Sequence, residues 1–259
     1  MRALPQKRWK TANATADVQP SISDCQWRLL GVQSAIANRQ STIPMSRAPS
    51  FAAVILAAGE SARMRTDKSL LPWPPSLAGP SESKDTFLSA AIHSLTSAAD
   101  FVLVVAGKNE AALAPVIYAN GASMAINPDP GRGQFSSLQV GLREVLNRGR
   151  DAAIVTLVDR PPVRAATIQN LCGAFMAAAE NKQWAVIPEY GGKHGHPFLA
   201  GRELIEAFLQ APATSSAREV EHRNQPRIAY LPVDDPFIAL NIDTPEDYAA
   251  LLAHSQRQS

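Results

Sequence analysis

FAAVILAAGESARMRTDK, residues 51–68, joins an apolar run to a loop of very small side chains. The run Phe51 to Ile55 is typical of a strand that is buried on both faces of a parallel sheet. Because Ala57-Ala58-Gly59 carries almost no side chain, a ligand can approach the backbone, and phosphate oxygens can reach exposed N–H groups. Arg63 and Lys68 then add fixed positive charge. The pattern predicts a site for a polyanion, most simply a nucleoside triphosphate.

This loop matches neither of the two commonest nucleotide-binding patterns, G-x-x-x-x-G-K-[ST] and G-x-G-x-x-G. Taken alone, it is also compatible with an ordinary strand-to-helix turn that carries two solvated cations. The rest of the chain has to distinguish a phosphate site from a structural turn.

Length and composition favour one α/β domain. The chain has 259 residues, of which 46% are hydrophobic and 19% charged, and this is enough to bury a sizeable core without a second domain. The net charge of +2 comes from residues 1–50, which hold seven of the 25 basic and two of the 23 acidic residues, so the remainder carries a charge of −3. Since the remainder has no basic stripe interleaved with aromatic residues, we expect no nucleic-acid partner.

Cysteine usage and hydropathy favour a cytoplasmic protein. Cys25 and Cys172 are the only cysteines, and neither has a second cysteine or a histidine at metal-ligand spacing. The sequence therefore predicts neither a disulfide framework nor a zinc site. No apolar run approaches the roughly 20 residues of a membrane span, and the N-terminus lacks the apolar stretch of a secretory signal. We expect no membrane partner.

Residues 1–50 mix Gln, Ser, Thr, Asn and Arg without a sustained period, which is typical of a poorly ordered extension. A basic leader of this kind can be an organelle transit peptide. An upstream extension of the reading frame explains it equally well, because Met45 closely precedes the first strand. We expect Met45 to start the functional chain, and loss of folding or activity in a chain that begins there would contradict this.

Apolar runs alternate with amphipathic segments from residue 51 onward. Strands are expected near residues 52–57, 100–106, 123–126, 152–158 and 184–188, and helices near residues 86–98, 109–119, 135–148 and 164–180. This rhythm is typical of βαβ units, whose helices cover both faces of a mostly parallel sheet. The predicted fold is a doubly wound, Rossmann-like three-layer α/β/α sandwich.

Two further extended runs lie near the C-terminus, Ile228–Val233 and Phe237–Ile242, and they flank Asp234-Asp235-Pro236. A short turn at this tripeptide predicts an antiparallel excursion. The sheet should therefore be mixed.

Two aspartates end predicted strands at the edge where such sheets bind ligands. Asp159 follows the run at residues 152–158, and the prolines after it stop the strand, while Asp243 follows the run Phe237–Ile242. Because Mg²⁺ takes one or two carboxylates together with phosphates and waters, these aspartates predict a magnesium site.

Asp243 could instead cap the helix that follows it. Thr244 at the N-cap and Pro245 at the first helical position already form a complete helix start. The side chain of Asp243 is then less needed as a cap, and this favours metal binding.

These motifs together resemble the MobA-like NTP transferase family, whose opening pattern is LAAGxSxRMGxxK. Four further motifs follow in the family's order: GRGQFSSLQVGL at residues 131–142, VDRPPV at 158–163, Gly195-His196-Pro197, and NIDTPED at 241–247. Within the superfamily, the last two look most like the molybdenum cofactor cytidylyltransferases. The resemblance covers nearly everything after residue 50 and implies a nucleotidyltransferase domain at residues 51–256, with the fold of the nucleotide-diphospho-sugar transferases.

The resemblance also implies a role for each matching residue. Leu56, Ala57, Ala58 and Gly59 would wrap the nucleotide, Arg63 and Lys68 would hold its phosphates, Asp159 and Asp243 would bind Mg²⁺, and His196 would contact the acceptor. The implied reaction is Mg²⁺-dependent transfer of a nucleoside monophosphate to a phosphate-bearing acceptor with release of pyrophosphate. Lys68, Arg63 and Asp159 would be its catalytic groups.

Ala58 resembles the loops of cytidylyl-type enzymes, since guanylyl relatives tend to have a second glycine there. By resemblance, CTP is the expected donor and molybdopterin the expected acceptor, with transient contact to molybdoenzymes or their chaperones. Two other functions remain open: a nucleotidyltransferase for a sugar or polyol phosphate, and a non-catalytic nucleotide-binding accessory protein. The presence of all the catalytic groups argues against the accessory protein.

Several residues allow a second interpretation. A surface hairpin with two solvated histidines explains the segment around His196 as well as acceptor binding does. Ser136 and Ser137 are expected to cap the helix that they open. Arg65 and Arg160 stand where the family usually has a glycine and an uncharged residue, and Arg160 adds a cation near the pyrophosphate or the acceptor.

Overall fold

The structure is a computed structural model that describes residues 50–59, 66–74, 85–212 and 214–255, with side chains described up to Leu251. All of these residues belong to one compact unit, residues 47–259. The predictions for the N-terminal extension with Met45, for Arg63 and for Arg65 lie outside the described residues and stay predictions.

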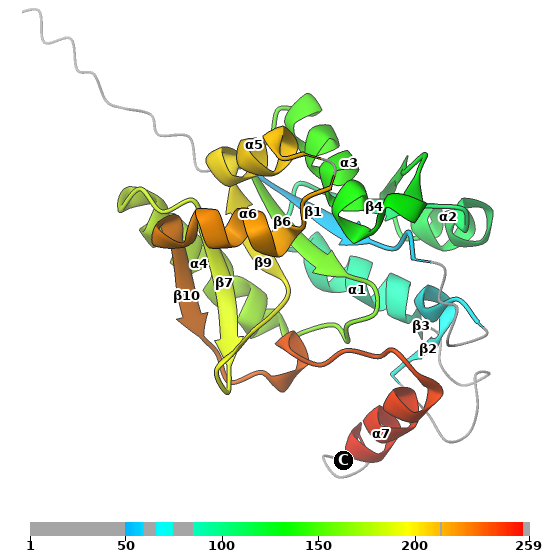
Figure 1. Ribbon diagram of the computed structural model, residues 1–259. Helices are drawn as coiled ribbons and strands as arrows, with labels where there is room; N and C mark the ends of the chain where they lie inside the picture. Colours follow the sequence, from blue (N-terminus) through cyan, green and yellow to red (C-terminus); the bar gives the residue numbers. More distant parts are fainter. Residues whose placement is uncertain (1–49, 60–65, 75–84, 213, 256–259) are drawn as a thin grey trace, which may run out of the picture. The chain divides into compact units, whose positions relative to one another are not determined.

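A central mixed sheet forms the core of the described unit (Figure 1). Its strands are β1 (Phe51–Leu56), β4 (Phe101–Ala106), β5 (Ser123–Ile126), β6 (Ala152–Leu157), β7 (Ala185–Tyr190), β8 (Lys193–His194), β9 (Phe198–Gly201) and β10 (Ile228–Pro232). Their order is β10-β7-β9-β6-β1-β4-β5, and β8 pairs with β7. β1 lies between β4 and β6 and is parallel to both. The carboxyl ends of these three strands therefore meet at one edge of the sheet.

Helices cover both faces of the sheet. One face is covered by α1 (Phe87–Thr96), α2 (Glu110–Ala119) and α4 (Ala165–Glu180), and the other by α3 (Gln134–Asn147), α5 (Arg202–Gln210) and α6 (Ala217–Arg223). On β1, Ala53 and Ile55 belong to the first core and Val54 to the second, because successive side chains of a strand point to opposite faces. Burying a side chain such as Ile55 contributes about 2 kcal/mol. The predicted three-layer sandwich is confirmed, as are the five strands and four helices predicted between residues 52 and 188.

The antiparallel excursion is not where the sequence predicted it. Ile228–Pro232 is a strand, but it pairs with β7 in parallel. The run Phe237–Ile242 is not a strand: Pro236–Ile238 forms the 3₁₀ turn η4, and irregular chain follows. The prediction of a second strand here was wrong, and Asp243 therefore does not end a strand.

The buried carboxylate of Asp235 explains this turn. Its Oδ1 accepts a hydrogen bond from the N–H of Phe237 at 3.1 Å, as the N-cap of η4. Its Oδ2 accepts from the N–H of Arg164 at 3.0 Å and from the hydroxyl of Thr167 at 2.7 Å. Since Pro236 has no N–H to give to a neighbouring strand, the chain turns here instead of extending.

β9, together with the two-residue strand β8, supplies the antiparallel pairing of the sheet. The four-residue strand β9 runs antiparallel to both β6 and β7 and joins the two halves of the sheet. No strand was predicted here, because Gly195, Pro197 and Gly201 in and beside the segment are typical of turns. The sheet is mixed, as predicted, but its antiparallel pairing does not come from the run Phe237–Ile242.

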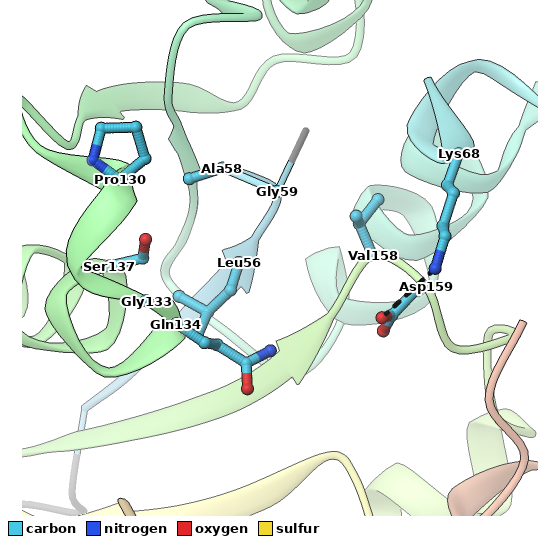
Figure 2. Close-up of a pocket in the computed structure, with 10 residues that line it drawn as sticks. All are labelled: Leu56, Ala58, Gly59, Lys68, Pro130, Gly133, Gln134, Ser137, Val158 and Asp159. Atoms are coloured by element: carbon cyan, nitrogen blue, oxygen red, sulfur yellow. Dashed lines mark ion pairs between the residues drawn. The ribbon is translucent and has the colours of Figure 1, made fainter. Parts of the chain in front are cut away.

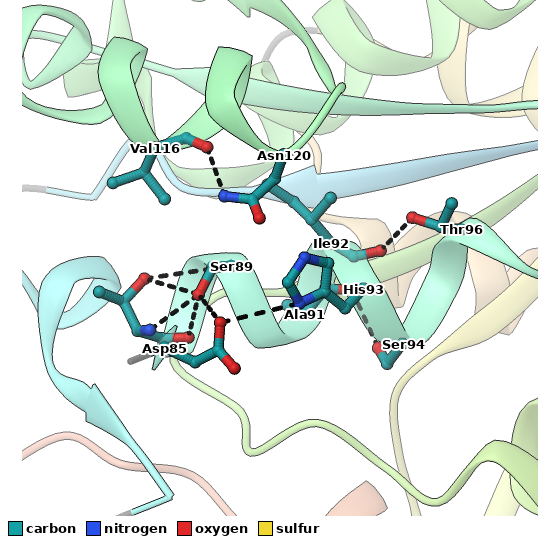
Figure 3. A network of polar contacts seen from close by, with 10 residues as sticks. Asp85, Ser89, Ala91, Ile92, His93, Ser94, Thr96, Val116 and Asn120 are labelled. Atoms are coloured by element: carbon teal, nitrogen blue, oxygen red, sulfur yellow. Dashed lines mark hydrogen bonds and ion pairs between the residues drawn. The ribbon is translucent and has the colours of Figure 1, made fainter. Parts of the chain in front are cut away.

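The start of α1 is fixed by a polar network (Figure 3). Thr86 Oγ1 accepts from the N–H of Ser89 at 3.1 Å, and Ser89 Oγ accepts from the N–H of Thr86 at 2.8 Å, which is a capping box. The Ser89 hydroxyl also donates to Asp85 Oδ1 at 3.0 Å. Asp85 and Thr86 form β3 (Asp85–Thr86), which pairs with β2 (Pro72–Trp73). The network therefore fixes the short ribbon that follows Lys68.

A third, smaller apolar cluster joins this ribbon to the C-terminal helix α7 (Pro245–Ser255). Its buried members are Phe87, Ile242 and Leu251, and Trp73 and Tyr248 pack against them. The Tyr248 hydroxyl donates to the carbonyl of Pro72 at 2.9 Å. Two segments at opposite ends of the domain are thereby held side by side.

Candidate active site

An open cleft of about 250 Å³ lies at the carboxyl ends of β1 and β6. Figure 2 shows its lining residues: Leu56, Ala58, Gly59, Lys68, Pro130, Gly133, Gln134, Ser137, Val158 and Asp159. They come from the end of β1 and the loop after it, the 3₁₀ turn η1 (Lys68–Leu70), the turn at Pro130, the start of α3 and the end of β6. The opening motif, the GRGQFSS motif and the VDRPPV motif therefore meet in one place.

The small-residue loop after β1 forms one wall of the cleft. Leu56, Ala58 and Gly59 line it, whereas Ala57 is buried and its N–H donates to the carbonyl of Val105 at 2.9 Å. The N–H of Ala57 is therefore used within the sheet. A Cβ added at Gly107 would lie 2.9 Å from the carbonyl oxygen of Ala58, so this wall depends on the close approach of two backbones.

The Asn109 amide holds the two flanks of the opening motif together. Its Nδ2 donates to the carbonyl of Ala57 at 3.0 Å and to Asp67 Oδ2 at 2.7 Å, and its Oδ1 accepts from the N–H of Gly107 at 3.1 Å. Asp67 Oδ1 accepts from the N–H of Ser69 at 2.9 Å and caps the 3₁₀ turn η1 (Lys68–Leu70). Asp67 therefore positions the turn that carries Lys68.

Lys68 and two carboxylates form the charged centre of the site. Lys68 Nζ lies 2.7 Å from Asp243 Oδ1 and 4.0 Å from Asp159 Oδ2 (Figure 2 shows the second pair). The side chain of Lys68 is only 13% exposed, so the ammonium is held in place between the two acids. Asp159 Oδ1 is buried and has no hydrogen-bond partner among the described residues.

Burial raises the pKa of the Asp159 carboxyl above its ordinary value, and the Lys68 and Arg160 cations partly offset this effect. Asp243 acts in the same direction as burial, because a second negative charge nearby disfavours ionisation. Ionisation of Asp159 therefore depends on the positive charge of Lys68 and Arg160.

Asp243 reaches this centre from the coil before α7. The helix start predicted from the sequence is present: Thr244 Oγ1 accepts from the N–H of Asp247 at 3.2 Å, and Asp247 Oδ2 accepts from the N–H groups of Thr244 and Asp243 at 2.8 and 2.9 Å. Thr244 and Asp247 cap the helix reciprocally, so the side chain of Asp243 is not used as a cap. Its oxygens contact Lys68 and the Asn241 amide instead.

The two aspartates fit a magnesium site that shares its ligands with the substrate. Mg²⁺ takes oxygen ligands and keeps several waters, and the buried, unpartnered oxygen of Asp159 is a ligand of this kind. The described residues include no group of three or more His, Cys, Asp or Glu side chains that could hold a metal. The other ligands of such an ion would come from phosphates and water.

The N-terminus of α3 opens into the cleft. Gly133 is its N-cap with φ 92°, no side chain caps the helix, and Gln134 lies at the cleft wall. Ser136 and Ser137 do not cap, so that prediction was wrong. Both hydroxyls accept from Asn127 Nδ2, at 2.8 and 2.9 Å. The uncapped N–H groups are a favourable position for negative oxygen atoms.

His196 lies beside the charged centre of Lys68, Asp159 and Asp243, and it does not line the cleft. Its ring is half-buried and packs edge-on against Phe198, and its Nδ1 is buried with no partner among the described residues. The alternative of a solvated histidine applies to His194, which is exposed and stacks on Tyr230 with ring centroids 4.1 Å apart. A Cβ at Gly195 would lie 2.2 Å from the carbonyl oxygen of Ile238, so only glycine fits there.

Burial lowers the pKa of His196 to about 3, and the Arg160 cation adds to this shift. Between pH 6.5 and about 3, the unfolded chain binds a proton at this position that the folded chain excludes. The free energy of unfolding therefore falls as the pH falls through this window. We expect the variant His196→Gln to lose less thermal stability than the wild type between pH 7 and pH 4.

Thermal unfolding followed by circular dichroism at both pH values measures this difference. The matched control is His194→Gln, which removes an exposed histidine from the same segment. Parallel loss of Tm in the wild type and in His196→Gln would contradict the prediction.

Three polar residues of the site were missed in the sequence analysis: Asn109, Asn127 and Gln134. Asn109 and Asn127 closely follow β4 and β5, and Gln134 begins α3. The same strand-end argument that identified Asp159 could have found the two asparagines. Gln134 gave no separate signal, because it lies inside the GRGQFSS motif.

Comparisons with known proteins agree with this geometry. A family model described as MobA-like NTP transferase domain matches residues 53–228. The chain is 24% identical over 201 residues to the molybdenum cofactor cytidylyltransferase of Escherichia coli (strain K12), which covers 75% of this chain and 92% of that protein. It is 29% identical over 209 residues to a probable molybdenum cofactor guanylyltransferase of Mycobacterium avium (strain 104), with coverage of 80% and 98%. The solved structure of Rv0371c from Mycobacterium tuberculosis H37Rv has a TM-score of 0.65 at 25% identity, with coverage of 79% and 98%.

Proposed function

Because the chain belongs to the MobA-like NTP transferase family and is a nucleotidyltransferase, we propose that it transfers CMP from CTP to molybdopterin in a Mg²⁺-dependent reaction. The single observation that carries this proposal is the position of Lys68 between Asp159 and Asp243 at the end of the cleft. A cation and two acids beside an uncapped helix N-terminus suit a triphosphate and its metal ion.

In the proposed reaction, a phosphate oxygen of the acceptor attacks the α-phosphorus of the triphosphate, the bond to the β-phosphate oxygen breaks, and pyrophosphate leaves. Lys68 stabilises the negative charge on the phosphate oxygens and holds them in line. Mg²⁺ bound by Asp159 and Asp243 would neutralise charge on the phosphates. No covalent intermediate with the protein is needed.

The reaction needs no dedicated general base, since the acceptor phosphate is already ionised at neutral pH. A pKa of about 3 keeps His196 neutral under the same conditions. We propose that His196 contacts the acceptor through a hydrogen bond and contributes no charge. Its buried and unpartnered Nδ1 is available to a group that reaches it.

The nucleobase is proposed from Ala58 and from the cytidylyltransferase relative. Ala58 lies in the wall of the cleft, where guanylyl-type loops tend to have a glycine. The similarity to a probable guanylyltransferase makes GTP the second candidate. Transient contact with molybdoenzymes or their chaperones would deliver the product.

Pyrophosphate release by the purified protein tests the proposal. CTP, GTP, ATP and UTP are each compared with Mg²⁺, with and without molybdopterin, and a set of sugar and polyol phosphates replaces molybdopterin in parallel reactions. We expect release only with CTP and molybdopterin together. Release with GTP would reassign the base, release with a sugar or polyol phosphate would reassign the acceptor, and triphosphate binding without release would favour an accessory role.

Among the described residues, no helix combines the length and the apolar character needed to span a bilayer. We also propose that the reaction takes place in the cytoplasm, as the cysteine usage favours.

A further inference from the structure

Arg160 directly follows Asp159 at the end of β6, and its side chain reaches the segment that carries Asp243. Nη1 donates to the carbonyl of Ile238 at 3.0 Å and lies 3.5 Å from the carbonyl of Leu240. The Nε of Arg160 is buried and has no partner among the described residues. The guanidinium thus bonds the backbone of residues 236–243, which we call the η4 loop.

Two other hydrogen bonds hold the η4 loop at the same place. The N–H of His196 donates to the Ile238 carbonyl at 2.9 Å, so this oxygen accepts from two donors. The N–H of Ile242 donates to the carbonyl of Asp159 at 2.9 Å. Close packing of Gly195 on Ile238 completes the contact. The VDRPPV motif, the Gly-His-Pro segment and the η4 loop therefore form one hydrogen-bonded unit.

Arg160 also brings a positive charge close to the two aspartates of the site. Arg160 interacts electrostatically with both Asp159 and Asp243, two carboxylates that repel each other across the site. Burial disfavours the charged guanidinium, and these carboxylates act against that effect. A lysine could supply the charge but not the rigid, planar guanidinium that places Nη1 near both carbonyls.

We propose that Arg160 is a positioning residue that fixes the η4 loop and thereby holds Asp243 at its working distance from Lys68 and Asp159. The inference rests on the proposed function in one respect, namely that Asp159 and Asp243 bind a metal ion together. It assigns Arg160 to the η4 loop, and through the loop to Asp243, rather than to direct contact with pyrophosphate or acceptor.

The chain offers a matched control. Arg164 Nη1 donates to the carbonyl of Asp234 at 3.0 Å, so it also bonds the backbone just before the η4 loop, but the contact is exposed and no carboxylate of the site adjoins it. Arg164→Ala removes a similar hydrogen bond, but it leaves the positive charge of Arg160 near Asp243 in place. A purely structural role for Arg160 would give the two variants the same behaviour.

The test compares wild type, Arg160→Ala, Arg160→Lys and Arg164→Ala. Hydrogen exchange measures protection of the amides of residues 238–242, Mn²⁺ titration followed by electron paramagnetic resonance measures metal affinity, and calorimetry measures CTP affinity. We expect Arg160→Ala to lose protection at residues 238–242 and to bind Mn²⁺ about 10- to 100-fold more weakly, as for removal of an outer-shell partner of a metal ligand. Arg160→Lys should recover part of the metal affinity, and Arg164→Ala should keep wild-type affinities.

Wild-type protection and Mn²⁺ affinity in Arg160→Ala would overturn the proposal, and so would equal losses in Arg160→Ala and Arg164→Ala. If Arg160→Ala does not fold, Arg160→Gln, which keeps one donor nitrogen, replaces it with the same expected direction. Hydrogen exchange does not depend on the reaction. A wild-type protein that binds neither Mn²⁺ nor CTP would therefore refute the proposed function, while the exchange comparison still decides whether Arg160 holds the loop.

Discussion

Asp159→Ala is expected to abolish Mg²⁺-dependent pyrophosphate release and to leave thermal unfolding largely intact. The carboxylate has one buried oxygen without a partner and lies beside Lys68. Metal-assisted stabilisation of the transferring phosphate contributes several kcal/mol. Because each loss of about 1.4 kcal/mol slows a reaction tenfold, kcat should fall by at least about 10³-fold.

Stability should survive the same change for two reasons. The hydrogen bond from Ile242 goes to the main-chain carbonyl of Asp159 and not to its side chain. Burial also disfavours the charged carboxylate, so removing it relieves a cost. Pyrophosphate release and differential scanning calorimetry on the same preparation measure both effects.

Asp151→Ala is the matched control, because Asp151 directly precedes the opposite end of β6 and contacts Arg202 at 3.2 Å near the surface. It should keep wild-type turnover. Full activity in Asp159→Ala would remove the metal assignment.

Lys68→Ala should weaken transfer by about 10²- to 10³-fold, the usual effect of deleting one preorganised electrostatic donor. The side chain is 13% exposed and is held by Asp243 at 2.7 Å, so it loses little freedom when it acts on the phosphates. Without it, the carboxylates of Asp159 and Asp243 face each other with less positive charge nearby.

Steady-state kinetics separates this loss into kcat and KM, and we expect most of it in kcat because the charge on the phosphates grows in the transition state. Lys182→Ala, at an exposed position after α4, is the control and should behave as wild type. An unchanged rate in Lys68→Ala would contradict its phosphate role.

The sequence predicted the layers of the fold because long apolar strands and amphipathic helices have clear periods. It failed where residues typical of turns flank a strand or where one residue overrides the period. β9 lies between Pro197 and the helix that begins at Arg202, in a glycine-rich stretch that is typical of turns. Asp235 turns the apolar run that follows it by capping η4. Neither feature can be recognised from the local spacing of apolar residues.

The candidate site divides in the same way. Asp159 could be predicted because it ends a strong strand, and Lys68 because of its motif. The placement of Asp243 was predicted for a wrong reason, since it lies in coil and reaches Lys68 through the packing of α7 and the η4 loop. The roles of Asn109 and Asn127 depend on long-range hydrogen bonds, which one sequence does not display.

The contact between Lys68 and Asp243 joins residues 175 positions apart, and the apolar cluster of Phe87, Ile242 and Leu251 supports it from the last helix. During synthesis, the strands β1, β4, β5 and β6 can pair long before Asp243 leaves the ribosome, since chains grow at roughly 5–20 residues per second. All the residues that line the cleft precede Asp243 in the chain, so they are synthesised before the second acid. In the proposed mechanism, the metal site is complete only after residue 243 has been synthesised, so a protein that ends before this residue would lack the second acid and should not catalyse the transfer.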